Sequence, residues 1–235
     1  MNKGAIMPEK ILIAEDDEDI VSILKLYLEN AGYSVMACFN GEDALKEVES
    51  KPDLCLFDIM MPKMNGYDLI REVRKKYVMP IIIISAKNKD SDKIIGLDLG
   101  ADDYILKPFN PLEVVARVRS ALRRYTMLNP AAQGDNPVLT SGDLKVDTNR
   151  MLLFKDGEEI KVTPTELKLL VMLMRNPGRV YTKAQIYENL IGENFLSDEN
   201  TIMVHISNLR NKIEDDPKKP RYLVTVRGLG YKFGS

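Results

Sequence analysis

The chain has 235 residues, of which 45% are hydrophobic and 29% charged, and its formal net charge is −2. This length accommodates two domains of ordinary size, and the composition is typical of a soluble globular protein and excludes a disordered chain. No apolar stretch reaches membrane-spanning length, and the start of the chain lacks the apolar core of a signal peptide. We therefore expect a cytoplasmic protein that has no membrane partner.

The first half of the chain alternates between two patterns. Short apolar runs predict strands, and each is followed by apolar residues at helical spacing. The expected strands are 10–14, 34–38, 54–58, 80–85 and 104–106, and the expected helices are 20–28, 41–50, 67–76, 90–99 and 111–124. Five strands alternating with five helices predict an α/β domain over residues 1–125, with a five-stranded, doubly wound parallel sheet.

Residues 126–137 contain two prolines and a glycine without periodicity, which predicts a flexible linker. The pattern changes over residues 138–235. Short strand-like pieces with a turn at Asp156-Gly157 come first, and three helices follow, beginning at Thr163, Lys183 and just after Asn200. The end, 222–233, is predicted to be a β-hairpin, so the second domain is expected to be an α+β winged helix.

The two cysteines and the single histidine limit the chemistry. Cys38 and Cys55 lie in apolar, strand-like runs and are predicted to be small buried hydrophobes in a reducing compartment. His205 alone leaves no His-rich metal site and no obvious Ser/His/Asp triad.

Polar side chains follow four of the five predicted strands of the first domain: Glu15 and Asp16, Asp58, Ser85, and Lys107. The carboxyl ends of parallel strands meet at one edge of a sheet, so these groups are expected to lie together. Three neighbouring acids repel one another unless a cation offsets their charge, and oxygen ligands suit Mg²⁺. Taken alone, Asp58 is better explained as a cap of the next helix, and only the other charged residues favour a functional role.

These residues belong to four motifs in a fixed order: Glu15-Asp16, Asp58-Ile-Met-Met-Pro62, Ser85-Ala86 and Gly100-Ala-Asp-Asp-Tyr-Ile-Leu-Lys-Pro-Phe109. Together they resemble the flavodoxin-like receiver domain of two-component response regulators, over about residues 9–125. The resemblance implies that Asp58 accepts a phosphoryl group, that Ser85 and Lys107 bind its oxygens, and that Lys107-Pro108 is a cis peptide. It also implies a Mg²⁺ cofactor held by Glu15, Asp16, Asp58 and the backbone carbonyl of Met60.

The resemblance further implies a switch, in which Tyr104 moves inward when Ser85 turns toward the phosphate. An ordinary half-buried tyrosine explains Tyr104 nearly as well. Asp17 is expected to be a supporting charge and not a metal ligand.

Residues 138–235 resemble the winged-helix effector of the OmpR/PhoB family through Thr163-Pro-Thr-Glu-Leu167, Thr201-Ile-Met-Val-His-Ile206 and Val226-Arg-Gly-Leu-Gly-Tyr231. The third helix is then the recognition helix, and residues 201–235 hold seven Lys or Arg against three Asp or Glu. The expected contacts with double-stranded promoter DNA are Thr201, Val204, His205, Ser207, Asn208, Arg210, Asn211 and, on the wing, Arg227. A position near phosphate is preferred to any metal role for His205. The segment 192–198 resembles the loop that touches RNA polymerase, although as a bare sequence it is an ordinary loop.

In this family, a surface between about residues 90 and 124 forms a dimer after phosphorylation. The charged residues expected on exposed positions of that interface are Lys93, Asp98, Asp102, Asp103, Glu113, Arg117, Arg119 and Arg124. The resemblance predicts a regulator and not an enzyme: its partner is a sensor histidine kinase, and it binds direct repeats. The alternatives are an aspartyl-phosphate phosphotransferase or phosphatase, and a DNA-binding regulator that works without phosphorylation. Met60 stands where the best-known enzymes of the first kind carry a second acid.

Overall fold

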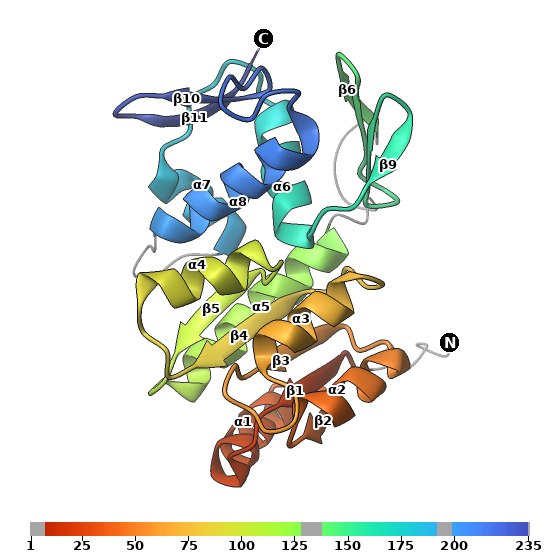
Figure 1. Cartoon of the computed structure of the whole chain (residues 1–235), viewed down its shortest axis with the longest axis vertical. Coiled ribbons are helices and arrows are strands. Elements are labelled where there is room, and N and C mark those ends of the chain that lie inside the picture. The colour runs from red at the N-terminus through yellow and green to blue at the C-terminus, as the bar shows by residue number, and fades with distance from the viewer. Residues whose placement is uncertain (1–7, 128–137, 192–198, 235) are drawn as a thin grey trace, which may run out of the picture. The chain divides into compact units, whose positions relative to one another are not determined.

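In a computed structural model of the chain, the described residues are 8–127, 138–191 and 199–234 (Figure 1). They form two compact units. Over these residues, no helix combines the length and the apolar character that a membrane span needs.

The N-terminal part is built on a parallel sheet of five strands, in the order β2-β1-β3-β4-β5. The strands are β1 (Lys10–Ala14), β2 (Ser34–Cys38), β3 (Leu54–Phe57), β4 (Ile81–Ser85) and β5 (Asp103–Leu106). The strand order reverses at β1, which lies between β2 and β3. In open sheets of this kind, such a reversal leaves a crevice at the carboxyl ends of the strands. The predicted five-stranded, doubly wound sheet is confirmed.

Four helices connect these strands, and a fifth helix follows β5 (Figure 1). They are α1 (Glu18–Asn30), α2 (Gly41–Glu47) with a short 3₁₀ turn at Val48–Ser50, α3 (Gly66–Arg74), α4 (Asp90–Asp98) and α5 (Pro111–Met127). The side chains of Asp17, Asn40 and Asn65 cap α1, α2 and α3 by accepting backbone N–H groups of the first turn. Helix α5 extends two residues into the predicted linker, and the rest of that linker, 128–137, lies outside the described residues.

The core of the N-terminal part follows the unbroken apolar runs of the sequence. Every residue of β3 and β4 is buried, as expected for strands covered by helices on both faces. Cys55 is fully buried in β3, and this burial raises the pKa of its thiol to about 12. Its predicted role as a small buried hydrophobe is confirmed, whereas Cys38 is only half-buried.

The C-terminal part begins with an antiparallel sheet of four strands in sequence order. The strands are β6 (Val138–Ser141), β7 (Leu144–Asp147), β8 (Leu152–Lys155) and β9 (Glu158–Ile160). Asp156 and Gly157 have φ angles of 52° and 84°, so the turn between β8 and β9 is left-handed at both central residues, as an Asp-Gly hairpin requires. The sequence predicted strand-like pieces here but not how they pair, and the structure pairs them in one sheet.

Three helices and a hairpin complete the C-terminal part: α6 (Pro164–Met174), α7 (Lys183–Ile191), α8 (Glu199–Ile213), β10 (Leu223–Val226) and β11 (Gly230–Phe233). Thr163 and Glu166 form the capping box that starts α6. One hydrophobic cluster holds residues from β7, β8, the three helices and the hairpin together. This is the predicted winged-helix arrangement, in which the wing is the hairpin β10–β11.

Candidate functional site

The carboxyl edge of the parallel sheet brings two buried carboxylates together. Glu15 directly follows β1, and its N–H donates to the carbonyl of Cys38 at 3.0 Å. Asp58 directly follows β3, and its N–H donates to the carbonyl of Ala14 at 2.8 Å. Sheet pairing therefore continues one residue beyond the strands and fixes the backbone of both acids. Their exposed fractions are only 2% and 5%.

Lys107 joins these two acids. Its Nζ lies 2.6 Å from Oε2 of Glu15 and 2.8 Å from Oδ2 of Asp58. Its backbone N–H donates to the carbonyl of Ser85 at 2.8 Å, which ties the residue to the end of β4. The following bond, Lys107-Pro108, is cis, as predicted.

Burial and charge act in opposite directions on this cluster. Burial raises the pKa of Glu15 above its ordinary value, and the hydrogen bond from Lys107 only partly offsets that effect. For Lys107, burial lowers the pKa, but the hydrogen bonds to Asp58 and Glu15 outweigh it, so the pKa is raised. The lysine is therefore held in its charged form beside the two carboxylates.

Asp16 completes a group of three acids that fits a hard cation. Oxygen atoms of Glu15, Asp16 and Asp58 all lie within 4.8 Å of one another, and Asp16 is exposed to solvent. Mg²⁺ binds through a few carboxylates with water completing its shell, and this donor set fits that requirement. The backbone N–H of Met60 donates to Oδ1 of Asp58 at 3.2 Å. No described contact tests the predicted role of the Met60 carbonyl.

The side chain of Asp58 does not cap the next helix. Its Oδ1 accepts the N–H of Ile59 at 2.5 Å, whereas α3 is capped by Asn65. The loop between them folds back so closely that a Cβ on Gly66 would lie 2.1 Å from the carbonyl oxygen of Asp58. Glycine is required at this position for that reason. Asp17 caps α1, so its role as a supporting residue is structural.

Ser85 and Tyr104 are connected through the loop after β4. Ser85 is fully buried, and its Oγ accepts the N–H of Lys87 at 3.3 Å. The hydroxyl of Tyr104, which is 8% exposed, donates to the carbonyl of Lys87 at 2.9 Å. Both side chains therefore bind the backbone of one residue, and a movement of that residue would reach both.

Several charges predicted on an exposed dimer surface are buried in pairs within the chain. Asp102, with an exposed fraction of 1%, pairs with Arg74 at 3.0 Å and accepts the N–H of Ile81 at 3.0 Å. Asp103 pairs with Arg117 at 2.8 Å, and Arg117 also pairs with Glu113 at 2.9 Å.

The predicted exposure of Asp102, Asp103 and Arg117 is therefore wrong. Asp102 pairs with Arg74, 28 residues away, and Asp103 pairs with Arg117, 14 residues away. Spacing along the sequence did not predict either pair. Asp98 and Arg119 are exposed, Lys93 is half-buried, and the side chain of Arg124 lies outside the described residues.

Helix α8 is buried over more of its circumference than the four-residue stripe of the sequence indicated. Thr201, Val204 and His205 have exposed fractions of 4%, 7% and 1%, and their contacts with DNA stay a prediction. Ser207 and Asn211 are exposed and Asn208 is half-buried. The segment 192–198 lies outside the described residues.

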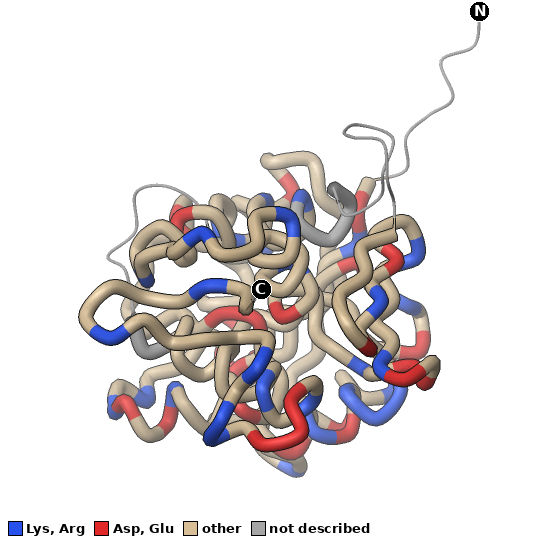
Figure 2. The backbone as a smooth tube through the Cα atoms, turned by 90° about the horizontal axis from the view of Figure 1, so that it is seen from above, with Lys and Arg blue, Asp and Glu red and all other residues tan. Residues whose placement is uncertain are grey.

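Two basic residues of the predicted DNA surface differ in their surroundings. The guanidinium of Arg210 binds β10 and lies 5.8 Å from the ring centre of Tyr231, so its charge is engaged within the domain. Arg227, at the tip of the wing, is exposed. Figure 2 shows Lys and Arg, and no Asp or Glu, along the hairpin between Leu223 and Phe233.

Comparisons with known families identify a domain in each part of the chain. Residues 11–119 match the model of the response regulator receiver domain, and residues 157–233 match that of the C-terminal domain of transcriptional regulatory proteins. The fold and the sites define a DNA-binding transcriptional response regulator. The chain belongs to the OmpR/PhoB type of two-component response regulators.

Individual relatives cover nearly the whole chain. The response regulator GtcR of Aneurinibacillus migulanus is 45% identical over 97% of this chain and 96% of its own length. The alkaline phosphatase synthesis transcriptional regulatory protein PhoP of Bacillus subtilis is 41% identical over 96% and 97%. Among solved structures, DrrB, an OmpR/PhoB homologue of Thermotoga maritima, is 31% identical, with a TM-score of 0.52 over 97% of this chain and 100% of DrrB.

Proposed function

We propose that this protein is a transcriptional switch in which Asp58 accepts a phosphoryl group from the phosphohistidine of a sensor histidine kinase. The observation that carries the proposal is the position of Lys107, whose ammonium lies within 2.8 Å of both Glu15 and Asp58 at the carboxyl edge of the sheet. A carboxylate between a cation and a hard-metal site is arranged for phosphoryl transfer, which needs positioning and charge neutralisation.

The residues divide the chemistry as follows. A carboxylate oxygen of Asp58 attacks phosphorus, an O–P bond forms, and the P–N bond to the donor imidazole breaks. Lys107 neutralises charge on the phosphoryl oxygens, and the hydroxyl of Ser85 donates to one of them after leaving its contact with the loop. Mg²⁺ held by Glu15, Asp16, Asp58 and the Met60 carbonyl supplies further charge neutralisation when bound.

The switch then follows from the shared partner of Ser85 and Tyr104. When Ser85 turns toward the phosphoryl group, the N–H of Lys87 loses its hydrogen bond to Ser85. The backbone of Lys87 is then free to move, and the hydrogen bond from the Tyr104 hydroxyl to its carbonyl changes with it. The surface of α4, β5 and α5 changes in consequence, and we propose that it forms a two-fold dimer. Because Arg117 is committed to Asp103 and Glu113, Arg119 is the exposed arginine that best tests this dimer.

In the C-terminal domain, α8 is proposed to read the major groove of promoter DNA through Ser207, Asn208 and Asn211, while Arg227 meets a phosphate or the minor groove. Contacts by Thr201, Val204 and His205 require that they become exposed. The dimer joins two such domains through the linker 126–137 and binds direct repeats, with RNA polymerase as a further partner. The protein works as a cytoplasmic regulator and not as an enzyme, because its phosphoryl group acts on its own conformation.

Phosphorylation of matched variants tests the proposal. Acetyl phosphate with Mg²⁺ should label the wild type and leave Asp58→Asn unlabelled. Asp53→Asn is the control, because Asp53 lies at the opposite end of the same strand and binds the N–H of Lys10 at 2.7 Å. Labelling of Asp58→Asn at the wild-type level would remove Asp58 from its role. Labelling that does not depend on Mg²⁺ would contradict the metal site.

A further inference from the structure

The C-terminal end of α8 holds the start of the wing through two charged side chains. The carboxylate of Glu214, which directly follows α8 and is 7% exposed, accepts three successive backbone N–H groups, of Arg221 at 2.7 Å, Tyr222 at 2.9 Å and Leu223 at 2.8 Å. A buried carboxylate with three such donors is well satisfied and holds their backbone in place.

Arg210, one turn earlier in the chain, binds the other polar groups of the same strand. Its Nε donates to the carbonyl of Leu223 at 2.9 Å, and its Nη2 donates to that carbonyl and, at 2.8 Å, to Oγ1 of Thr225. Both the N–H and the C=O of Leu223 are thus bound by the end of α8. The planar fork of an arginine suits two acceptors in fixed positions, which an ammonium does not reproduce.

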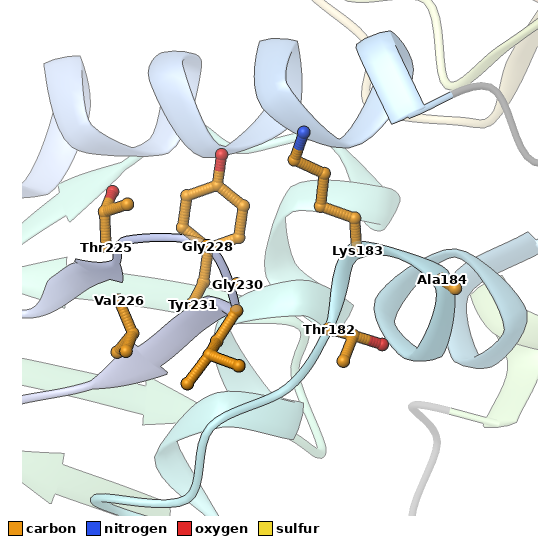
Figure 3. A pocket seen from close by; sticks show the side chains of 9 residues that line it. Thr182, Lys183, Ala184, Thr225, Val226, Gly228, Gly230 and Tyr231 are labelled. Atoms are coloured by element: carbon orange, nitrogen blue, oxygen red, sulfur yellow. The ribbon is translucent and has the colours of Figure 1, made fainter.

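Backbone hydrogen bonds from two further residues support the wing, and one side of the wing is open. Tyr181 exchanges two backbone hydrogen bonds with Tyr231, the second residue of β11, at 2.8 and 2.9 Å, and the N–H of Gly178 donates to the carbonyl of Phe233, the last residue of β11, at 3.0 Å. Beyond this bridge, a pocket of about 320 Å³ separates the hairpin from the start of α7. Figure 3 shows that the side chains of Thr225 and Tyr231, which line this pocket, point toward α8, whereas Val226 points the opposite way.

We infer that Arg210 is a positioning residue for the wing: it sets the place of Arg227 relative to the recognition helix, and it does not itself contact DNA. The inference rests on the proposed DNA-binding function and refines it. Arg210 is half-buried, with its fork directed at β10. Arg227 is exposed and directly follows Val226, the last residue of β10, at the tip of the hairpin. Arg210 therefore affects DNA binding through Arg227.

A double-mutant cycle separates the two roles. Equilibrium binding of the phosphorylated full chain to one promoter duplex is measured for wild type, Arg210→Ala, Arg227→Ala and the double variant, over a range of salt concentrations. If Arg210 acts through the wing, the double variant should bind no more weakly than Arg210→Ala, because the Arg227 contact is already lost. If Arg210 meets a phosphate itself, the two fold-losses multiply, and the salt slope falls by about a further 0.9 in the double variant.

Conservative and control variants sharpen the result. Arg210→Lys keeps the charge without the fork, so it should behave like Arg210→Ala, and full recovery by lysine would overturn the inference. The control is Asn211→Ala, which changes an exposed neighbour on α8. In this background, Arg227→Ala should weaken DNA binding by the same factor as it does in the wild type. Thr225→Val removes only one acceptor of Arg210 and keeps the test available if Arg210→Ala does not fold.

Limited proteolysis of the DNA-free chain gives an independent measure. Trypsin cleaves after Arg227, and this cut should become faster in Arg210→Ala and Thr225→Val than in the wild type and Asn211→Ala. Unchanged cleavage in both Arg210→Ala and Thr225→Val would contradict a positioning role. Faster cleavage in a protein that binds no duplex would instead contradict the proposed function and leave the contact between α8 and the wing intact.

Discussion

At the scale of single residues, the phosphoacceptor site depends on one cation balancing two buried anions. Lys107 contacts both Glu15 and Asp58, so the two carboxylates share the positive charge of one ammonium group. A buried carboxylate without a partner is costly, because desolvation penalises its ionised form. The same arrangement that stabilises the resting site thus keeps an ammonium beside the oxygen that is to carry the phosphoryl group.

A second buried pair, remote from Asp58 in sequence, supports β5. Arg74 Nη2 lies 3.0 Å from Asp102, and its other nitrogens donate to the carbonyls of Gly100 and Met79 at 2.8 Å. Arg74→Ala leaves the Asp102 carboxylate buried without this partner, and we expect it to lower the free energy of unfolding of the receiver by about 3–5 kcal/mol. Urea unfolding, followed by circular dichroism, measures the loss.

The matched control is Arg71→Ala on the same helix. Arg71 pairs with Asp68 at 2.7 Å, but both side chains are exposed, at 56% and 48%. The expected cost is about 0–1 kcal/mol. Equal losses in the two variants would show that burial does not decide the strength of these pairs.

At the scale of elements, the four-stranded sheet is attached to the wing by a polar contact. The Tyr222 hydroxyl and Nη2 of Arg221 both donate to Asp143, which lies in the turn between β6 and β7. Tyr222 also stacks on Phe233, with ring centres 5.6 Å apart. These contacts join segments almost eighty residues apart, and they hold the two residues just before β10 against the turn between β6 and β7.

The charge of Asp143 makes this attachment dependent on pH. The hydrogen bond from Tyr222 is the main cause that lowers the pKa of Asp143 below its ordinary value of 3.8. A carboxyl with a lowered pKa in the folded state contributes stability that is fully present above its unfolded pKa and is lost as the pH falls through its folded pKa. Asp143→Asn should therefore cost about 0–1 kcal/mol at neutral pH.

The difference between wild type and Asp143→Asn should shrink only below the ordinary pKa of Asp143. Urea unfolding of both proteins from neutral pH down to the acid limit of folding measures it. A difference that stays constant throughout this range would mean that the Asp143 charge plays no part, and that only the shape of its side chain matters.

At the scale of the whole molecule, the modest basic excess of residues 201–235 predicts few phosphate contacts for each DNA-binding domain. Two effectors joined by a dimer bind as one ligand, and linkage of this kind raises apparent affinity by about 10²–10⁴-fold without a new contact. Phosphorylation that drives dimerisation would thereby increase DNA binding while α8 and the wing remain unchanged.

Paired sites test this coupling. The phosphorylated protein should bind two direct repeats one helical turn apart at least about tenfold more tightly than a single half-site. The unphosphorylated protein should show a smaller difference, and Arg119→Glu should reduce the gain by weakening the dimer. Gel-shift titrations with duplexes of equal length, including one whose second half-site is moved by half a turn, make the comparison. Equal affinity for one and two half-sites would exclude linked binding.

The sequence by itself determined the parts of this protein that depend on local pattern. Unbroken apolar runs indicated β3 and β4, helical spacing indicated α1 and α8, and polar residues at four strand ends indicated the acid cluster with Lys107. These features follow from periodicity and from the rule that parallel strands end at one edge, so no tertiary contact is needed to predict them.

Only the tertiary structure decided which charged side chains bind partners within the chain and which are exposed to solvent. Asp102 and Arg74 lie 28 residues apart, and Arg210 and Thr225 lie 15 apart. The family resemblance suggested a dimer contact for Asp102 and a DNA contact for Arg210. The partner of a long, charged side chain is set by packing between elements, and sequence spacing carries no signal for it.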